Sequence, residues 1–145
     1  MRKVILGLVA VWLSCGSSNS SQAPLNAAFA GTWAGTITFS GTITGSANAQ
    51  LIISGVNGNS MQIGPLCPDG TGTVTATGSG NTASWSGSLA CAPTSGLSNC
   101  PSAVLTFTSL SSALSGTTLS GTADGNLSGC PSGNGAFHIN FSATH

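Results

Sequence analysis

Few side chains of this 145-residue chain can carry out acid–base chemistry. The side-chain carboxylates are Asp69 and Asp124, and one histidine, His138, lies in an expected strand. Each aspartate precedes a glycine, which is typical of a turn. A calcium loop needs several oxygen ligands close together, and glycoside hydrolysis needs two facing carboxylates. A catalytic histidine needs a nucleophile and an orienting acid beside it, and serine is too common here to single one out. We expect turns at both aspartates, a solvent-facing His138, no catalytic residue, no metal, no cofactor and no enzymatic activity.

The first fifteen residues, MRKVILGLVAVWLSC, have the layout of a secretory signal. Arg2 and Lys3 form a basic head, and residues 4–13 form an apolar run that ends close to Cys15. This run is too short for a transmembrane helix, which needs about 20 residues. The segment therefore predicts export from the cytoplasm rather than a spanning helix.

The apolar run followed by Ser14 and Cys15 resembles the lipobox of bacterial lipoproteins, although Trp12 stands where that family usually has leucine. In that family, cleavage before the cysteine leaves it as the acylated N-terminus. The resemblance implies a signal peptide over 1–14 and a lipid anchor at Cys15 in the cell envelope. It also implies the outer membrane, because no aspartate follows the cysteine. An ordinary secretory signal without lipidation is the alternative. The Ser-rich residues 15–28 are expected to form the anchor and a flexible tether with a reach of about 20 Å.

Residues 15–145 contain no lysine and no arginine, because Arg2 and Lys3 are the only two in the chain. Binding to nucleic acid requires such cations to neutralise phosphates, and a polybasic membrane contact requires them as well. Both kinds of contact are excluded, as is recognition of an anionic substrate through arginine or lysine. Regularly spaced apolar and aromatic residues argue against a disordered chain.

From residue 29 onward, apolar and hydroxyl side chains alternate, which is typical of antiparallel strands with one buried face. Between Trp33 and Ile43, apolar residues and glycine hold the odd positions, and threonine or serine holds most even ones. No stretch after the leader has helical spacing with capping signals. The chain thus predicts one all-β domain over 29–145 with about eight strands, as an antiparallel barrel or, alternatively, a β-sandwich. A barrel is favoured because closure removes exposed strand edges, which no lysine guards here. The expected runs are 33–43, 49–53, 61–63, 71–77, 81–89, 103–109, 113–123 and 136–144.

Gly31, Thr32 and Trp33, at the start of the first expected strand, resemble the opening of lipocalin-like barrels. In that family a Gly-x-Trp begins the first strand, and the tryptophan closes the base of the barrel. The resemblance implies a barrel with Trp33 at its base. The basic residue that stacks on this tryptophan in the family is not expected here, because the body has no lysine or arginine. A core tryptophan at a strand start, without kinship, is the alternative.

Four cysteines follow the leader, and an even number in an exported chain predicts two disulfides with three possible pairings. Cys67 and Cys91 flank two expected strands, and Cys100 and Cys130 flank the next two, so each pair would meet at the open end of a hairpin. We therefore predict Cys67–Cys91 and Cys100–Cys130, each stabilising the fold by roughly 3–4 kcal/mol. A zinc site of four thiolates is the alternative, but no Cys-x₂-Cys pair is present.

Two functions are consistent with these features. The first is a non-enzymatic binding module, in which the barrel interior or mouth holds a small apolar or amphipathic ligand such as a lipid. A barrel filled by its own side chains would leave no such site. The second is a structural or surface-coat lipoprotein that self-associates or contacts polysaccharide through its uncharged Ser/Thr-rich exterior. The expected ligand-lining residues are the aromatic residues that share the inward parity of their strands: Trp33, Phe39, Trp85, Phe107, Phe137 and Phe141.

Overall fold

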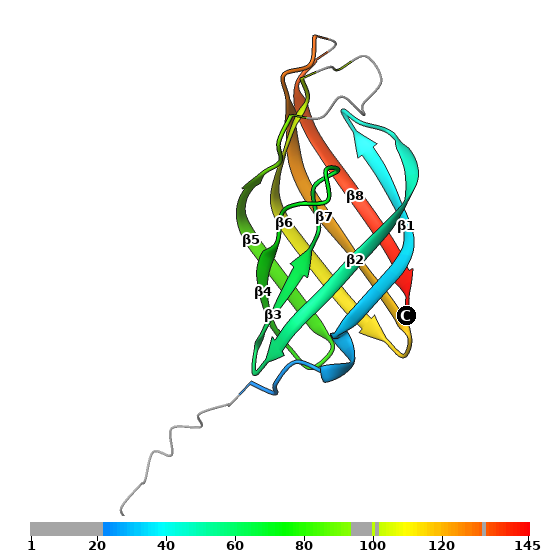
Figure 1. Ribbon diagram of the computed structural model, residues 1–145, viewed down its shortest axis with the longest axis vertical. Coiled ribbons are helices and arrows are strands. Elements are labelled where there is room, and N and C mark those ends of the chain that lie inside the picture. The colour runs from blue at the N-terminus through cyan, green and yellow to red at the C-terminus, as the bar shows by residue number, and fades with distance from the viewer. Residues whose placement is uncertain (1–21, 94–99, 101, 132) are drawn as a thin grey trace, which may run out of the picture.

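The computed structural model describes residues 22–93, 100, 102–131 and 133–145. Eight antiparallel strands close into one barrel, in which each strand pairs with its neighbours in sequence and β8 pairs with β1 (Figure 1). The prediction of an all-β barrel of about eight strands is confirmed, and the sandwich alternative is set aside. The elements are η1 (Ala27–Phe29), β1 (Gly31–Gly41), β2 (Gly45–Asn57), β3 (Ser60–Gly64), β4 (Val74–Ser79), β5 (Thr82–Ala90), β6 (Val104–Ser115), β7 (Thr118–Ser128) and β8 (Gly135–Thr144).

Alternation along the strands separates the interior of the barrel from its surface. On β1, Trp33 is buried and Ile37 packs against the core, whereas the threonines between them and beyond are exposed. On β8, Phe137 and Ile139 are buried and Asn140 is exposed. Successive side chains of a strand point to opposite faces, so a period of two in the sequence becomes an apolar inside and a hydroxyl-rich outside.

Several strand boundaries differ from the sequence prediction, and the largest difference is at the connection between β6 and β7. The expected run over 113–123 contains the turn between β6 and β7, at Gly116. The reason is a β-bulge in β6 between Phe107 and Ser109, which shifts the inward-facing positions from odd to even numbers. Phe107 is buried before the bulge and Leu110 is buried after it. A prediction that assumes strict alternation therefore fails inside this strand and places its end at the wrong residue.

η1 lies at the base of the barrel, the end next to the N-terminal segment (Figure 1). Trp33 is buried against it. The Trp33 indole Nε1 donates a hydrogen bond to the Phe29 carbonyl oxygen at 2.8 Å. The His145 ring meets Trp33 edge-on with ring centroids 4.8 Å apart, and its Nε2 lies 3.3 Å from the Ala30 carbonyl oxygen. A Cβ at Gly31 would collide with His145, so the first glycine of the Gly-x-Trp sequence makes room for this ring. The side chain that stands against Trp33 is therefore a histidine ring, a residue type that the expectation about lysine and arginine did not consider.

The segment before η1 is bound to the base of the barrel. Leu25 is buried, and its N–H donates to the Gly58 carbonyl oxygen at 2.7 Å, in the turn between β2 and β3. The flexible tether expected over 15–28 is therefore shorter than composition indicated, because residues 23–26 form hydrogen bonds with the β2–β3 and β4–β5 turns. Residues 15–21 lie outside the described part of the chain. Within the described part, no helix is long and apolar enough to cross a bilayer.

The upper end of the barrel, opposite the base, carries both disulfides. Cys67 pairs with Cys91 and Cys100 pairs with Cys130, with Cα–Cα distances of 5.4 and 4.9 Å. The predicted connectivity is confirmed, because β4–β5 and β6–β7 are hairpins whose open ends bring the flanking cysteines together. Sulfurs bonded to one another are not available as thiolate ligands, which sets the four-thiolate zinc alternative aside.

Candidate functional site

In the upper half of the barrel, strand pairing is interrupted between β2 and β5, because the two strands between them, β3 and β4, are short. We call this interruption the seam. β3 ends at Gly64, opposite Ile52 of β2. Among the described residues, 45–51 of β2 therefore pair with β1 alone. On the other side of the seam, β4 pairs with β5 only over 77–79. The loop of residues 65–73 lies between β3 and β4 at this seam (Figure 1).

A cleft of about 480 Å³ lies at the seam, with walls from β1, β2, β6, β8 and the 65–73 loop. Most of its walls are apolar, and the bordering residues with polar side chains are Asn48 and Gln50, which occupy exposed positions of β2. None of its lining residues carries a titratable side chain, because Cys67 is in a disulfide. The cleft therefore suits uncharged groups, since a buried ion here would have no counter-charge. The lining residues are Ile37, Phe39, Ala47, Asn48, Ala49, Gln50, Pro65, Leu66, Cys67, Pro68, Gly70, Leu105, Phe107 and Ile139.

The 65–73 loop is a tightly bonded wall of this cleft. The Leu66 N–H donates to the Gly72 carbonyl oxygen at 2.9 Å, and the Cys67 N–H donates to the Thr71 carbonyl oxygen at 2.9 Å. The Cys67–Cys91 disulfide ties the loop to the residue that follows β5. The loop thus holds its shape through its own backbone bonds, and one covalent link fixes its position on the barrel.

Two of the six aromatic residues predicted to line a ligand site, Phe39 and Phe107, border the cleft from β1 and β6. The ring of Phe137 packs edge-on against that of Phe107, with centroids 5.4 Å apart, and so supports the cleft from the core. Trp33 lies at the base of the barrel against η1. The residues of the predicted set that do not border this cleft are Trp33, Trp85, Phe137 and Phe141.

Aliphatic and loop residues complete the cleft, and the sequence prediction did not include them. Ile37 and Ile139 occupy inward-facing positions of their strands, as the predicted aromatic residues do. The same alternation would have identified them if the prediction had not been limited to aromatic side chains. Pro65 and Leu66 offered no such signal, because strand periodicity carries no information about where a loop folds. Their place in the cleft follows from the short β3.

The two aspartates lie in different settings, and only one is in a turn. Asp69 is in the 65–73 loop, where Oδ1 accepts hydrogen bonds from the Thr71 Oγ1 at 2.6 Å and the Thr71 N–H at 3.0 Å, which lowers the pKa of Asp69. Asp124 lies inside β7, so the predicted turn there was wrong. The glycine after it serves packing instead, because a Cβ at Gly125 would collide with the ring of Phe137.

Asp124 faces His138 across β7 and β8 on the outer wall, and its Oδ1 lies 2.6 Å from the His138 Nδ1. Ser109 of β6 donates to the Asp124 Oδ2 at 2.9 Å. The His138 and Ser109 hydrogen bonds lower the pKa of Asp124. The His138 and Asp124 side chains are 41% and 53% exposed. The serine hydroxyl bonds to the aspartate rather than to the histidine, so the group lacks the nucleophile–base contact that nucleophilic catalysis requires.

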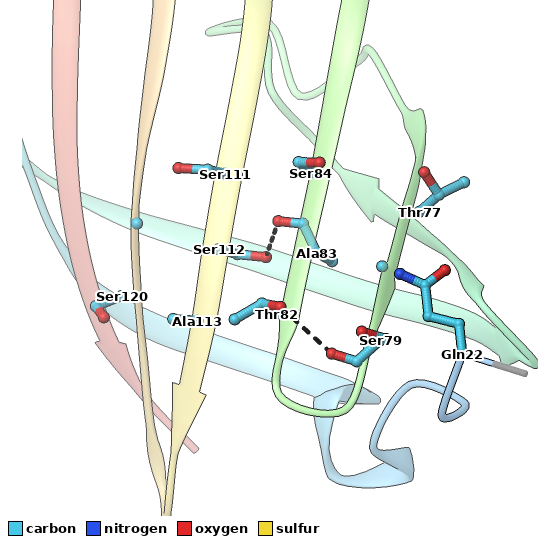
Figure 2. A pocket seen from close by; sticks show the side chains of 12 residues that line it. Gln22, Thr77, Ser79, Thr82, Ala83, Ser84, Ser111, Ser112, Ala113 and Ser120 are labelled. Carbon is cyan, nitrogen blue, oxygen red and sulfur yellow. Dashed lines mark hydrogen bonds between the residues drawn. The ribbon is translucent and has the colours of Figure 1, made fainter. Parts of the chain in front are cut away.

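A second hollow, of about 470 Å³, lies on the outer wall over β4, β5, β6 and β7 (Figure 2). Seven of its twelve lining residues are serine or threonine, and Gln22 of the N-terminal segment stands at one side of it. The Thr82 Oγ1 donates to the Ser79 carbonyl oxygen at 3.3 Å, and the buried Ser112 Oγ donates to the Ala83 carbonyl oxygen at 3.3 Å. This hollow offers hydrogen bonds without rings or charges. Its lining residues are Gln22, Thr77, Gly78, Ser79, Thr82, Ala83, Ser84, Ser111, Ser112, Ala113, Ser120 and Gly121.

The expected lipid anchor at Cys15 lies outside the described residues. Among the residues that are described, no three of the histidine, cysteine, aspartate and glutamate side chains come together as a possible metal site. Comparisons of the chain with family models, with curated proteins and with solved structures find no match. The barrel and its cleft are therefore the basis for a functional proposal.

Proposed function

We propose that this chain is an exported, lipid-anchored protein of the bacterial cell envelope, at the outer membrane, that binds a small apolar or amphipathic ligand without catalysing a reaction. The observation that carries the proposal is the cleft of about 480 Å³ at the seam. Its size falls within the range typical of ligand pockets, about 300–1,000 Å³. The apolar walls suit a hydrocarbon or a ring, and the edge of the cleft at Asn48 and Gln50 suits a neutral polar group.

The packing of the base supports a ligand site at the upper end. Trp33, Ile53 and Met61 are all less than 2% exposed, so the lower barrel is filled by its own side chains. Small barrels are often filled in this way. The placement of Trp33 between η1 and His145 also supports the resemblance to lipocalin-like barrels.

The bound N-terminal segment constrains how an anchored barrel would sit. Cys15 precedes Gln22, the first described residue, by seven positions. A chain of that length spans at most about 25 Å when fully extended. A lipid at Cys15 would therefore keep the base of the barrel close to the membrane, with the cleft at the far end. The two disulfides are typical of a compartment outside the cytoplasm.

The test compares the compounds that copurify with the exported protein and with two variants. Ala49→Phe places a ring in the cleft, whereas Ala34→Phe places the same ring on the exposed face of β1 as a matched control. Mass spectrometry of organic extracts is expected to find a compound in the wild type and in Ala34→Phe. In Ala49→Phe that compound should fall by about tenfold, which corresponds to about 1.4 kcal/mol of lost binding. An extract without such a compound, or equal amounts in all three proteins, would contradict the proposal.

Contact with polysaccharide is a second candidate function, favoured by the hydroxyl-lined hollow on the outer wall. A neutral sugar in this hollow would be recognised through hydrogen bonds, which the serine and threonine hydroxyls of the protein can donate and accept. A glycan array is expected to give a signal that is lost in the double variant Ser84→Ala/Ser120→Ala. The control is Thr38→Val on the exposed face of β1, away from the hollow. An array without signal for the wild type rules this candidate out and leaves the cleft proposal unaffected.

A further inference from the structure

Four consecutive residues of β2, 47–50, line the cleft. Successive side chains of a strand point to opposite faces, so a cavity that touches one face alone would be lined by every second residue. Contact with all four residues places the edge of β2 in the wall of the cleft. The groups available at such an edge are backbone N–H donors and C=O acceptors.

Within the described chain, this edge has no backbone partner. Residues 45–51 pair with β1 on one side, and pairing with β3 begins at Ile52. The 65–73 loop forms another wall of the cleft, but the N–H groups of Leu66 and Cys67 bond inside the loop itself. Strand edges of this kind are templates for the addition of another strand. Closure of the barrel has removed such edges elsewhere in the pairing order, but the seam exposes one on β2 and one on β5. The edge that lines the cleft is the one on β2.

We propose that the ligand of the cleft is an uncharged, extended peptide segment that adds to β2 as an extra strand. This inference rests on the proposed function, because it names the ligand class for the same cleft. Main-chain hydrogen bonds to residues 45–51 provide the affinity, and pockets for alternate side chains provide the specificity, as in other cases of strand addition. Seven residues present about 23 Å of edge, enough for a peptide of similar length.

The chemistry of the lining favours such a peptide over a hydrocarbon chain and over a charged ligand. No lining residue is titratable, so an ionised carboxylate or ammonium group in the cleft would be desolvated without a counter-charge. A hydrocarbon alone would cover the edge of β2 and leave its N–H and C=O groups unpaired, which is costly. Ile37, Phe39 and Phe107 offer apolar contacts for the inward-facing side chains of an added strand.

Two N-methylated isomers of one peptide test this geometry. The parent is a capped, uncharged heptapeptide of alternating threonine and valine that carries a neutral fluorophore. It is used at concentrations at which light scattering shows that the peptide is monomeric. One isomer is N-methylated at every odd residue and the other at every even residue. In a strand, the N–H groups of alternate residues face opposite neighbours. One isomer therefore keeps its hydrogen bonds to β2, and the other loses them.

Binding is measured by fluorescence anisotropy with the lipid-anchored protein in nanodiscs of neutral phospholipid, and empty nanodiscs serve as the control. The parent and one isomer are expected to bind with Kd values within about twofold of each other. The other isomer should bind about tenfold or more weakly, because each lost hydrogen bond contributes about 1 kcal/mol. Equal Kd values for the two isomers, or no binding of the parent, overturn the inference.

The copurification experiment distinguishes failure of this inference from failure of the proposed function. A non-peptide compound that is present in the wild type and lost in Ala49→Phe would leave the binding function standing and overturn the peptide as its ligand. No compound and no peptide binding would overturn both proposals. A copurifying peptide that competes with the parent heptapeptide supports both.

Discussion

Gly125 of β7 and Phe137 of β8 are cross-strand partners, and the glycine lies where a Cβ would collide with the aromatic ring. The same ring packs edge-on against Phe107, which borders the cleft. The glycine that made Asp124-Gly125 resemble a turn is thus required by packing inside the barrel. Through Phe137 it also supports one wall of the candidate site.

Gly125→Ala is expected to destabilise the barrel by about 1–3 kcal/mol, because the added methyl group would collide with the Phe137 ring and with the backbone carbonyl oxygen of Thr106. Urea unfolding of the purified protein measures the decrease in the free energy of unfolding. The double variant Gly125→Ala/Phe137→Leu should lose less than the sum of the two single changes, because the smaller side chain makes room for the methyl group. Additive losses would show that the glycine accommodates the Thr106 carbonyl oxygen rather than the ring.

Removal of either disulfide is expected to lower the free energy of unfolding by about 2–4 kcal/mol. The two bridges should differ in their effect on the cleft. Cys67→Ala/Cys91→Ala frees the 65–73 loop, so the copurifying compound should decrease, whereas Cys100→Ala/Cys130→Ala serves as the matched control and leaves the compound in place. Equal loss of the compound in both double variants would argue against the loop as a wall of the site.

Asp124→Asn is expected to make stability less dependent on pH in acid. The hydrogen bonds of His138 and Ser109 hold the pKa of Asp124 below its ordinary value of 3.8. A lowered folded-state pKa contributes stability that is present above the unfolded-state pKa and lost as the pH falls through the folded-state pKa. The contribution is expected to be a few tenths of a kcal/mol, roughly, because the pair is exposed and screened by solvent.

Urea unfolding at pH 7 and at pH 3 checks this acid dependence. The wild type should lose more stability between the two pH values than Asp124→Asn. Ser109→Ala removes one of the two hydrogen bonds to the Asp124 carboxylate. This variant should also lose less stability between pH 7 and pH 3 than the wild type, but its departure from the wild type should be smaller than that of Asp124→Asn. An unchanged difference in both variants would mean that the pair contributes nothing to folding.

His145→Ala is expected to destabilise the base of the barrel by about 0.5–1.5 kcal/mol, the range typical of an aromatic pair. The change should also alter the near-ultraviolet circular dichroism of Trp33, because the His145 ring meets the indole edge-on. Thr144→Ala, at the exposed neighbouring position, is the control. A spectrum and an unfolding curve identical to those of the wild type would show that the contact has no energetic role.

Cys15→Ser is expected to abolish acylation, since the proposed anchor is attached through the cysteine sulfur and the new N-terminus at this residue. Metabolic labelling with a radioactive fatty acid should mark the wild type and leave the variant unlabelled. Ser17→Ala, two residues away, is the control and should be labelled normally. Label in the Cys15→Ser protein would disprove the lipid anchor while leaving the barrel and its cleft untouched.

Local patterns in the sequence were sufficient for the fold class and for the disulfide pairing. The alternation on β1 and β8 is a property of neighbouring residues, and it decides which side of each strand is buried. The Cys67–Cys91 pairing follows from a hairpin, which brings together whatever residues flank it. Neither inference required knowledge of how distant strands are staggered.

Tertiary structure alone decided where the cleft lies and which residues share it. Phe39 and Trp33 have the same inward parity on β1, yet one borders the cleft and the other is packed into the base. The pairing of Asp124 with His138 likewise depends on the register of β7 against β8. Strand register, the bulge in β6 and the short β3 are set by contacts between segments far apart in the chain. A pattern with a period of two shows which way a side chain faces, and it carries no information about its height along the barrel axis.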